Sequence, residues 1–241
     1  MAKTAIITGG SRGIGAACAA QLAKDGYAVV INYLANEAAA RAVQKEIFEQ
    51  GGEATIFGGD VRSPESMKAL AAFAVGQYGR IDALVCSAGV CGFALAQDST
   101  GDFAARLLDI NTQGTINACA AAIPHMLSRG GAIITLASMW GEVGSSCESV
   151  YSASKGAVIA YTKALAKELG CSKITVNCVS PGFIDTEMNA GVSADARAQL
   201  VEETPLGRIG TPQDVAEAVA ALVRLRFVTG QVLGVNGGLV I

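Results

Sequence analysis

Histidine and clustered metal ligands are scarce in this sequence. His125 is the only histidine among 241 residues, so a Ser-His-Asp hydrolase is excluded. Seven cysteines are present, but none form a CxxC pair, and Cys86 and Cys91 have no partners at the spacing of a zinc site. We therefore expect no bound metal and no metal-dependent catalysis.

Charge and long apolar runs are scarce as well. Charged residues make up 16% of the chain, the net charge is −3, and no run of lysines or arginines occurs, so nucleic acid and anionic membranes are not expected as partners. No apolar run approaches the ~20 residues that cross a bilayer. Residues 1–7 contain neither the apolar region nor the cleavage site of a secretory signal. Cysteines such as Cys18, Cys119 and Cys178 lie inside apolar patterns, which is typical of reduced, buried thiols, and we expect a cytoplasmic protein.

Hydrophobic residues are abundant, at 51% of the chain, and occur in short runs that alternate with helical patterns. The runs predict strands at 5–8, 28–33, 54–58, 83–87, 132–137, 175–180 and 232–235. The segments between them predict helices at roughly 14–25, 37–50, 64–78, 103–126, 150–169 and 212–225. This alternation predicts an α/β fold, a single Rossmann-type domain over residues 1–241 with a doubly wound, seven-stranded parallel sheet flanked by helices on both faces.

The longest irregular stretch follows the sixth predicted strand, from Pro181 to about Pro212. A long, glycine-containing segment at the carboxyl end of a strand suits a lid over a substrate, which we place at about 183–212. The low charge leaves apolar surface to be covered, so we also expect a homo-oligomer with helix-on-helix interfaces.

The first predicted strand ends in the sequence TGGSRGIG, residues 8–15, and a helical pattern follows directly. Gly9, Gly13 and Gly15 would let the backbone turn tightly and approach a pyrophosphate. The helix amino terminus offers free N–H groups and the positive end of the helix dipole. Because this loop lies between a first strand and a first helix, it predicts a dinucleotide-binding site.

Tyr151 and Lys155 lie four residues apart in a predicted helix, and therefore on one face of it. A free tyrosine has a pKa of about 10 and is a poor acid–base catalyst at neutral pH. A neighbouring ammonium group stabilises the phenolate and would bring that pKa toward the working pH. This spacing alone is common on helix surfaces, so the pair depends on the other motifs for its interpretation.

The glycine spacing resembles the TGxxxGxG motif of the short-chain dehydrogenase/reductase family, and the resemblance extends over essentially the whole chain. Asn111, Ser138, Tyr151 and Lys155 match the family's catalytic tetrad in order. The resemblance implies a carbonyl reductase in which Tyr151 gives a proton to the developing alkoxide and Ser138 hydrogen-bonds the same oxygen. It further implies that Lys155 lowers the tyrosine pKa and holds the nicotinamide ribose, while Asn111 steadies a water that relays protons.

The resemblance also implies a nicotinamide cofactor held by several segments. The expected contacts are Gly9, Ser11, Arg12, Gly13, Ile14, Gly15, Asn32, Tyr33, Asp60, Val61, Ser87, Ala88, Gly89, Tyr151, Lys155, Pro181, Gly182, Ile184 and Thr186. Among these, Asp60 and Val61 match the pair that contacts adenine, and Ile184 and Thr186 match residues that contact the carboxamide. After the fourth strand the family usually has Asn-Asn-Ala-Gly where this chain has CSAG at 86–89, so an altered cofactor affinity is expected.

The second predicted strand distinguishes between the two nicotinamide cofactors. It ends in Asn32 and Tyr33, without the carboxylate that binds the ribose 2′-hydroxyl of NAD. Arg12 could pair with a 2′-phosphate through its guanidinium fork, so NADP(H) is expected. Many NADP-using relatives have a second basic residue just after this tyrosine, where this chain has Leu34, which leaves use of NAD(H) open.

Within the family, the chain is similar to 3-oxoacyl-[acyl-carrier-protein] reductases in length, in the glycine loop, in the FIDTEM segment (183–188) and in its carboxyl end. This similarity implies fatty acid synthesis, a carrier-bound substrate, a homotetramer, and Arg129 and Lys173 as docking residues for the acidic carrier. Residues 138–148 are similar instead to reductases of the 5-aminopentanone group on elongation factor P, and Glu142 and Glu148 would suit a cationic substrate. Another small-carbonyl reductase and a non-catalytic NADP-binding sensor are the remaining alternatives.

Overall fold

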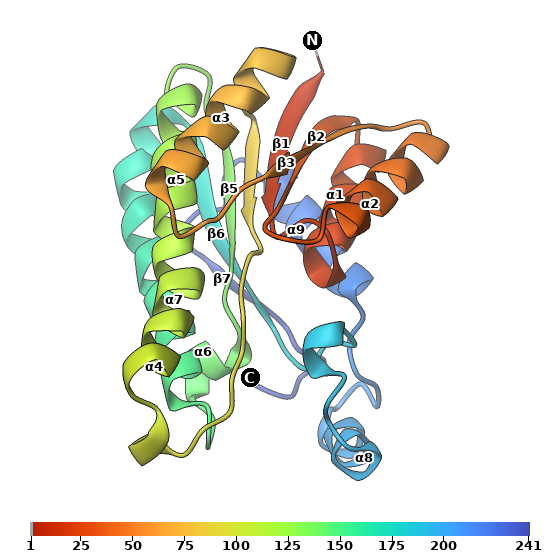
Figure 1. The fold of residues 1–241 in the computed structure, drawn as a ribbon, viewed down its shortest axis with the longest axis vertical. Coiled ribbons are helices and arrows are strands. Elements are labelled where there is room, and N and C mark those ends of the chain that lie inside the picture. Colours follow the sequence, from red (N-terminus) through yellow and green to blue (C-terminus); the bar gives the residue numbers. More distant parts are fainter. Residues whose placement is uncertain (1) are drawn as a thin grey trace.

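The protein, described over residues 2–241 in a computed structural model, is built around one sheet of seven parallel strands (Figure 1). The strands are β1 (Lys3–Thr8), β2 (Tyr27–Tyr33), β3 (Glu53–Gly58), β4 (Ala83–Cys86), β5 (Gly131–Leu136), β6 (Ile174–Pro181) and β7 (Val232–Val235). They lie in the order β3-β2-β1-β4-β5-β6-β7. The predicted α/β fold, a single Rossmann-type domain with a doubly wound, seven-stranded parallel sheet, is confirmed.

Helices cover both faces of this sheet. One face carries α1 (Gly13–Lys24), α2 (Glu37–Glu49) and α9 (Pro212–Arg224), and the other carries α3 (Pro64–Tyr78), α5 (Gly114–Met126) and α7 (Ser149–Leu169) (Figure 1). Because both faces are covered, β5 and β6 are buried along their whole length. This burial is the reason that the strands are continuous apolar runs rather than alternating patterns.

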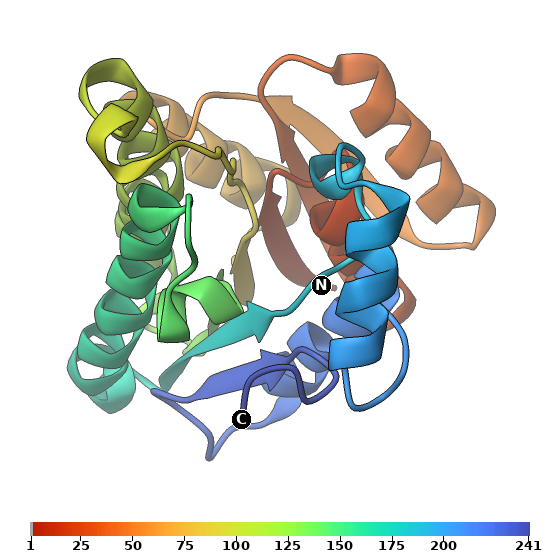
Figure 2. The ribbon, with the colours of Figure 1, turned by 90° about the horizontal axis from the view of Figure 1, so that it is seen from below.

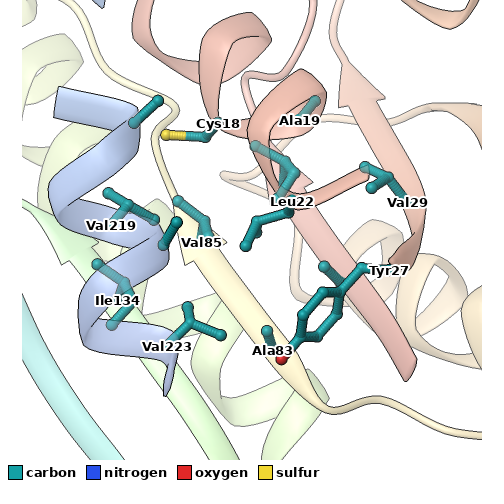
Figure 3. Close-up of a cluster of buried hydrophobic side chains, with 14 of the residues drawn as sticks. Cys18, Ala19, Leu22, Tyr27, Val29, Ala83, Val85, Ile134, Val219 and Val223 are labelled. Carbon is teal, nitrogen blue, oxygen red and sulfur yellow. The ribbon is translucent and has the colours of Figure 1, made fainter. Parts of the chain in front are cut away.

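The larger core cluster fills the space between α1, α9 and the sheet (Figure 3). Cys18 and Leu22 of α1 lie near Val219 and Val223 of α9 and Val85 of β4, and all five side chains are buried. Burial raises the pKa of the Cys18 thiol to about 12. This cysteine therefore acts as a small hydrophobic side chain, as its sequence pattern predicts.

Capping residues determine where α3 and α9 begin. The Ser63 hydroxyl accepts a hydrogen bond from the Ser66 backbone N–H at 3.1 Å, and Pro64 takes the first position of α3. Thr211 and Asp214 form a capping box at the start of α9, which also begins with a proline. Such local signals are present in the sequence, and the predicted starts of both helices are confirmed.

The helix predicted over 103–126 is interrupted in the structure. It consists of α4 (Gly101–Leu108), a π-helical turn η2 (Asp109–Gln113) and then α5. The chain stays helical across the junction, because Asp109 and Gly114 both have right-handed helical dihedrals. A π-helical turn inside a longer helix often marks a functional position, and this one contains Asn111.

Two helices were not predicted. A short α6 (Met139–Val143) follows β5, and α8 (Ala194–Glu203) lies in the stretch expected to be irregular. No residue of α8 is fully buried, so the segment has no apolar face from which a helix could be predicted. The remaining turns are the 3-10 segments η1 (Ala96–Asp98), η3 (Gly170–Ser172) and η4 (Glu187–Asn189).

The parallel strands all end at the edge of the sheet that lies opposite the chain's N-terminus. The helices α4, α6 and α8 are at this end of the molecule (Figure 1). The view onto it shows α8 and the predicted lid segment across from α4 and α6 (Figure 2). Within residues 2–241, none of the helices is long and apolar enough to cross a membrane.

Candidate active site

The site lies at the carboxyl edge of the sheet, where β1 and β4 are neighbours. The chain leaves β1 into α1 on one face and leaves β4 toward α4 and α5 on the other. Because the loops after β1 and β4 run to opposite faces of the sheet, they leave room for a ligand between them. Open parallel α/β sheets bind their cofactors at such a point.

The glycine-rich loop after β1 has no space for side chains at two of the predicted positions. Gly9 has φ +63°, and a Cβ there would lie 2.7 Å from the Ala88 Cα in the loop after β4. A Cβ on Gly15 would lie 2.2 Å from the Gly9 carbonyl oxygen. Because both distances are far below contact, only glycine lets the loop, α1 and the chain after β4 approach this closely.

The amino end of α1 is suited to an anion. Arg12 is the N-cap residue, but no side chain caps the helix, and its first turn has no acidic residue. The first N–H groups and the positive end of the helix dipole are therefore available to a pyrophosphate. Together with the glycines, this arrangement fits a dinucleotide cofactor.

Ser138, Tyr151 and Lys155 lie together at the ends of β5 and α7. Ser138 follows β5 and caps α6, where its Oγ accepts a hydrogen bond from the Trp140 backbone N–H at 3.2 Å. Tyr151 lies in the first turn of α7, and the Lys155 Nζ is 5.9 Å from the centre of the Tyr151 ring. All three side chains are buried, so their charges and protons are shielded from bulk water.

The pKa values of this group differ from those expected. Burial raises the pKa of Tyr151 to about 12, although a hydrogen bond with Ser138 lowers it in part. Burial also lowers the pKa of Lys155 to about 8. The Lys155 Nζ donates to the Leu136 carbonyl oxygen at 2.8 Å. The net shift of the Tyr151 pKa is upward, and stabilisation of its phenolate by this lysine stays a prediction. Tyr151 is therefore protonated at neutral pH, which suits a proton donor.

Asn111 is buried in the π-helical turn η2 and joins two parts of the site. Its side chain accepts from the Val90 N–H at 2.8 Å and donates to the Val90 carbonyl oxygen at 2.9 Å. The second amide hydrogen goes to the Ser154 Oγ at 3.0 Å. The structure thus gives Asn111 a positioning role between the loop after β4 and α7, and a relay through water to Lys155 stays a prediction.

Comparisons with known proteins agree with this geometry. The family model described as Enoyl-(Acyl carrier protein) reductase matches residues 9–240. An uncharacterized oxidoreductase of Methylorubrum extorquens is 44% identical over 98% of this chain and 97% of its own. The 3-oxoacyl-[acyl-carrier-protein] reductase FabG of Staphylococcus aureus is 38% identical over 99% of this chain and 98% of its own. The crystal structure of a dehydrogenase/reductase from Sinorhizobium meliloti matches with a TM-score of 0.94 at 40% identity, over 99% of this chain and 95% of that one.

The chain belongs to the short-chain dehydrogenase/reductase family. It is therefore an oxidoreductase, which sets aside the non-catalytic sensor. Short-chain dehydrogenases/reductases generally use NAD(P)H, and the glycine-rich loop of this chain fits such a cofactor.

Two residues on the predicted adenine side of this short-chain dehydrogenase/reductase are engaged within the protein. The buried Asn32 side chain donates its amide N–H groups to the carbonyl oxygens of Phe57 at 3.3 Å and Gly59 at 3.0 Å, and its contact with the cofactor stays a prediction. The Asp60 carboxylate accepts from the Arg62 backbone N–H at 2.9 Å and from its guanidinium at 2.7 Å, which lowers the Asp60 pKa. Asp60 keeps acceptor capacity for an adenine amino group, and that contact stays a prediction.

Arg12, predicted to meet a 2′-phosphate, lies at the exposed edge of the site. Its Nη1 is 3.2 Å from the Glu187 Oε2 of η4, and both side chains are largely exposed. Tyr33 ends β2 and is half-buried, while the next residue, Leu34, is exposed. An exposed ion pair contributes little, so a phosphate group could displace Glu187 from Arg12 at small cost.

The segment after β6 reaches the glycine-rich loop. A Cβ on Gly182 would lie 2.7 Å from the Asn236 Cα, and the buried Ile184 forms a β-bridge with Gly210. The Thr186 Cγ2 is 3.5 Å from the place a Cβ on Gly13 would take. The fold thus brings the predicted cofactor segments 9–15 and 181–186 side by side.

Two residues of the site were not foreseen in the sequence. The Ser154 Oγ donates to the Tyr151 carbonyl oxygen at 2.7 Å and accepts from Asn111. A serine one turn after Tyr151 in the predicted helix was a signal available in the sequence, while its burial is known only from the structure. Val90 contributes only backbone groups, which no side-chain pattern could have identified.

Proposed function

We propose that this protein reduces a ketone to a secondary alcohol with NADPH and that Tyr151 supplies the proton. The observation that carries the proposal is the position of Tyr151, buried beside Ser138 and Lys155 at the sheet edge that carries the glycine-rich loop. A reduced nicotinamide bound at that loop would supply the hydride.

Each of the three side chains has a step in this reaction. The Ser138 Oγ accepts from the Trp140 N–H, so its hydroxyl hydrogen, which is directed at Tyr151, can turn to a substrate carbonyl oxygen bound between the two residues. Tyr151 keeps its proton at neutral pH, because burial raises its pKa to about 12, and gives it to the developing alkoxide. Lys155, with a pKa of about 8, is charged at neutral pH, and its ammonium stabilises the phenolate that remains.

The oxidation of NADPH in the presence of a panel of ketones tests this function. Acetoacetyl thioesters and simple methyl ketones should be consumed with one NADPH oxidised per alcohol formed. If the protein binds NADPH but reduces none of these ketones, the proposal is wrong.

For the physiological substrate we propose a 3-oxoacyl group on acyl carrier protein, reduced in the cytoplasm by a homotetramer. The support is that the relatives in Staphylococcus aureus and Chlamydia muridarum, 38% and 36% identical, are named 3-oxoacyl-[acyl-carrier-protein] reductase. Reduction of modified elongation factor P, with no activity on acyl thioesters, would replace this assignment with the aminopentanone alternative.

A basic surface cavity of about 930 Å³ supports an acidic carrier as partner. Arg129 and Lys173 line it with three further basic side chains, and its one acidic residue, Asp82, is paired with Arg80. The cavity lies at the amino ends of the strands, away from Tyr151. For a carrier bound there, we propose that the acyl group enters the site of another copy in the homotetramer.

Replacing both Arg129 and Lys173 with Ala is expected to raise the KM for a carrier-bound substrate by about tenfold, because two charge-assisted contacts are lost. The KM for the same acyl group on N-acetylcysteamine should not change. An equal effect on both substrates would place the defect in the active site and exclude docking at this cavity.

Replacing Arg12 with Ala is expected to raise the KM for NADPH by about tenfold while the KM for NADH changes less than about twofold, because only NADPH carries the 2′-phosphate. Steady-state kinetics with both cofactors measures this. Glu187→Gln is the matched control, since it releases Arg12 from its ion pair and should not weaken NADPH binding. Equal losses with both cofactors would contradict the assignment of Arg12.

A further inference from the structure

Gly141 is the third residue of the short helix α6, and it lies against α7 in the candidate active site. Its φ is not in the left-handed region, so the backbone conformation does not require a glycine, and glycine inside a helix is less favourable than alanine. A Cβ on Gly141 would lie 2.8 Å from the Lys155 carbonyl carbon and 3.0 Å from the Gly156 nitrogen. Both are backbone atoms, which cannot rotate away as a side chain can. The two helices therefore touch at this point and leave no room for a side chain on α6.

Lys155 contacts the chain on both sides of Ser138. Its Nζ donates to the Leu136 carbonyl oxygen at 2.8 Å, two residues before the serine. Its backbone lies against Gly141, three residues after the serine, and the Gly141 N–H donates to the Ser138 carbonyl oxygen at 2.8 Å. The segment 136–141 is therefore held against one residue of α7 at both of its ends, with Ser138 between them.

Two further contacts hold α6 in place along α7. A Cβ on Gly156 would lie 3.3 Å from the Gly141 carbonyl oxygen, so the crossing is close from the side of α7 as well. Just after α6, the Ser145 N–H donates to the Ser152 Oγ at 3.2 Å. These contacts determine how the start of α6 lies relative to the first turns of α7, which carry the catalytic tyrosine.

The proposed reaction is sensitive to this placement, because Ser138 and Tyr151 act on one oxygen atom. The Ser138 hydroxyl forms a hydrogen bond with Tyr151, and both groups must come within hydrogen-bond distance of the substrate carbonyl oxygen. A displacement of about 1 Å in such a group lowers a rate by about 100-fold. We propose that Gly141 is a positioning residue: by allowing α6 to touch the backbone of α7, it sets the place of Ser138 beside Tyr151. The proposal rests on the ketone reduction proposed above, and it concerns where the serine is held rather than which substrate is reduced.

Replacing Gly141 with Ala tests this placement. The added Cβ has to separate the two helices, and α6 is the one expected to move, because it has one buried residue whereas α7 has eight. We expect kcat for acetoacetyl-N-acetylcysteamine with NADPH to fall by about 100-fold. The Kd for NADPH, measured by fluorescence titration, should change less than about twofold, because the glycine-rich loop is distant in the fold from the substitution.

A double-mutant cycle distinguishes positioning from a general structural effect. Ser138→Ala by itself is expected to lower kcat by about 100-fold, because it removes the hydrogen bond to the carbonyl oxygen. If Gly141 acts through Ser138, adding Gly141→Ala to Ser138→Ala should lower kcat by less than about threefold more, since the serine that it positions is gone. A further loss of about 100-fold in the double variant would show that the two residues act independently and would overturn the proposal.

Two other glycines provide a milder variant and a control. Gly156→Ala introduces a looser contact at the same crossing, so we expect a fall in kcat of about fivefold, again absent in the Ser138→Ala background. This variant tests the proposal if Gly141→Ala does not fold. Gly76 is exposed in the helix α3, and an added Cβ there would have no atom of another segment within 4 Å. Gly76→Ala should therefore leave kcat within about twofold of the wild-type value.

The outcomes distinguish this inference from the function beneath it. Unchanged kcat in both Gly141→Ala and Gly156→Ala would overturn the positioning role while ketone reduction by the wild-type protein stands. A Kd for NADPH that rises in parallel with the loss of kcat would also overturn it, because the substitution would then disturb the whole site. If the wild-type protein itself reduces no ketone, the proposed function fails, and this inference fails with it.

Discussion

Replacing Tyr151 with Phe is expected to lower kcat by about 1,000-fold, because the substitution removes the proton donor and leaves the ring in place. Phe fills the same buried volume at the start of α7, so the fold and the glycine-rich loop should be preserved. The measurement is the rate of NADPH oxidation at saturating ketone, with cofactor binding followed separately by fluorescence titration.

Tyr161→Phe provides the control for this variant. Tyr161 lies on the same helix and is partly buried, but it packs against the core on the α5 side, away from the site. Loss of its hydroxyl should leave kcat within about twofold. Turnover by Tyr151→Phe comparable with that of Tyr161→Phe would show that the proton comes from elsewhere and would refute the mechanism.

Replacing Lys155 with Met is expected to lower kcat by about 100-fold or more and to change how stability depends on pH. The loss of activity follows because no ammonium remains to stabilise the Tyr151 phenolate. In the wild-type protein the folded-state pKa of Lys155 is about 8, below the value of about 10.4 in an unfolded chain. Between these two values the unfolded state binds the proton and the folded state does not, so the free energy of unfolding rises with pH.

Urea denaturation of both proteins from pH 7 to pH 10.5 measures this difference. The free energy of unfolding of the wild type should rise relative to that of Lys155→Met by about 3 kcal/mol across the window, as a shift from 10.5 to about 8 implies. Loss of the hydrogen bond to the Leu136 carbonyl oxygen affects the variant equally at every pH, so it does not alter the slope. Parallel stability curves for the two proteins would show that Lys155 is not desolvated in the folded state.

The pattern of apolar runs and turns was sufficient for the fold because each signal acts locally. Continuous apolar strands require helices on both faces, and the caps at Ser63 and Thr211 set helix starts without help from distant residues. The π-helical turn around Asn111 could not be predicted, because it depends on pairing with Val90 in a separate loop. The helix α8 escaped prediction because it buries no side chain fully and so has no apolar periodicity.

The sequence likewise predicted one part of the candidate site and missed another. Motif spacing identified the residue types for a nicotinamide cofactor and a proton donor, from the glycine loop to Tyr151 and Lys155. Motif spacing could not predict the pKa values of these side chains, because a pKa depends on burial and on neighbours that are distant in the sequence. For that reason burial raises the pKa of Tyr151, in the direction opposite to the one that its spacing to Lys155 predicts, and the amide N–H groups of Asn32 donate to carbonyl oxygens of the chain around β3.

The sequence by itself determined the doubly wound α/β fold, the family and the chemical identity of the catalytic side chains, because hydrophobic periodicity and short motifs are properties of neighbouring residues. Only the tertiary structure decided which groups are desolvated and what they face. It buried Tyr151 as a protonated phenol, placed Lys155 against the Leu136 carbonyl oxygen and paired the Asn111 side chain with the Val90 backbone. These properties arise from segments that fold together from β4, β5 and α7, and no local pattern contains them.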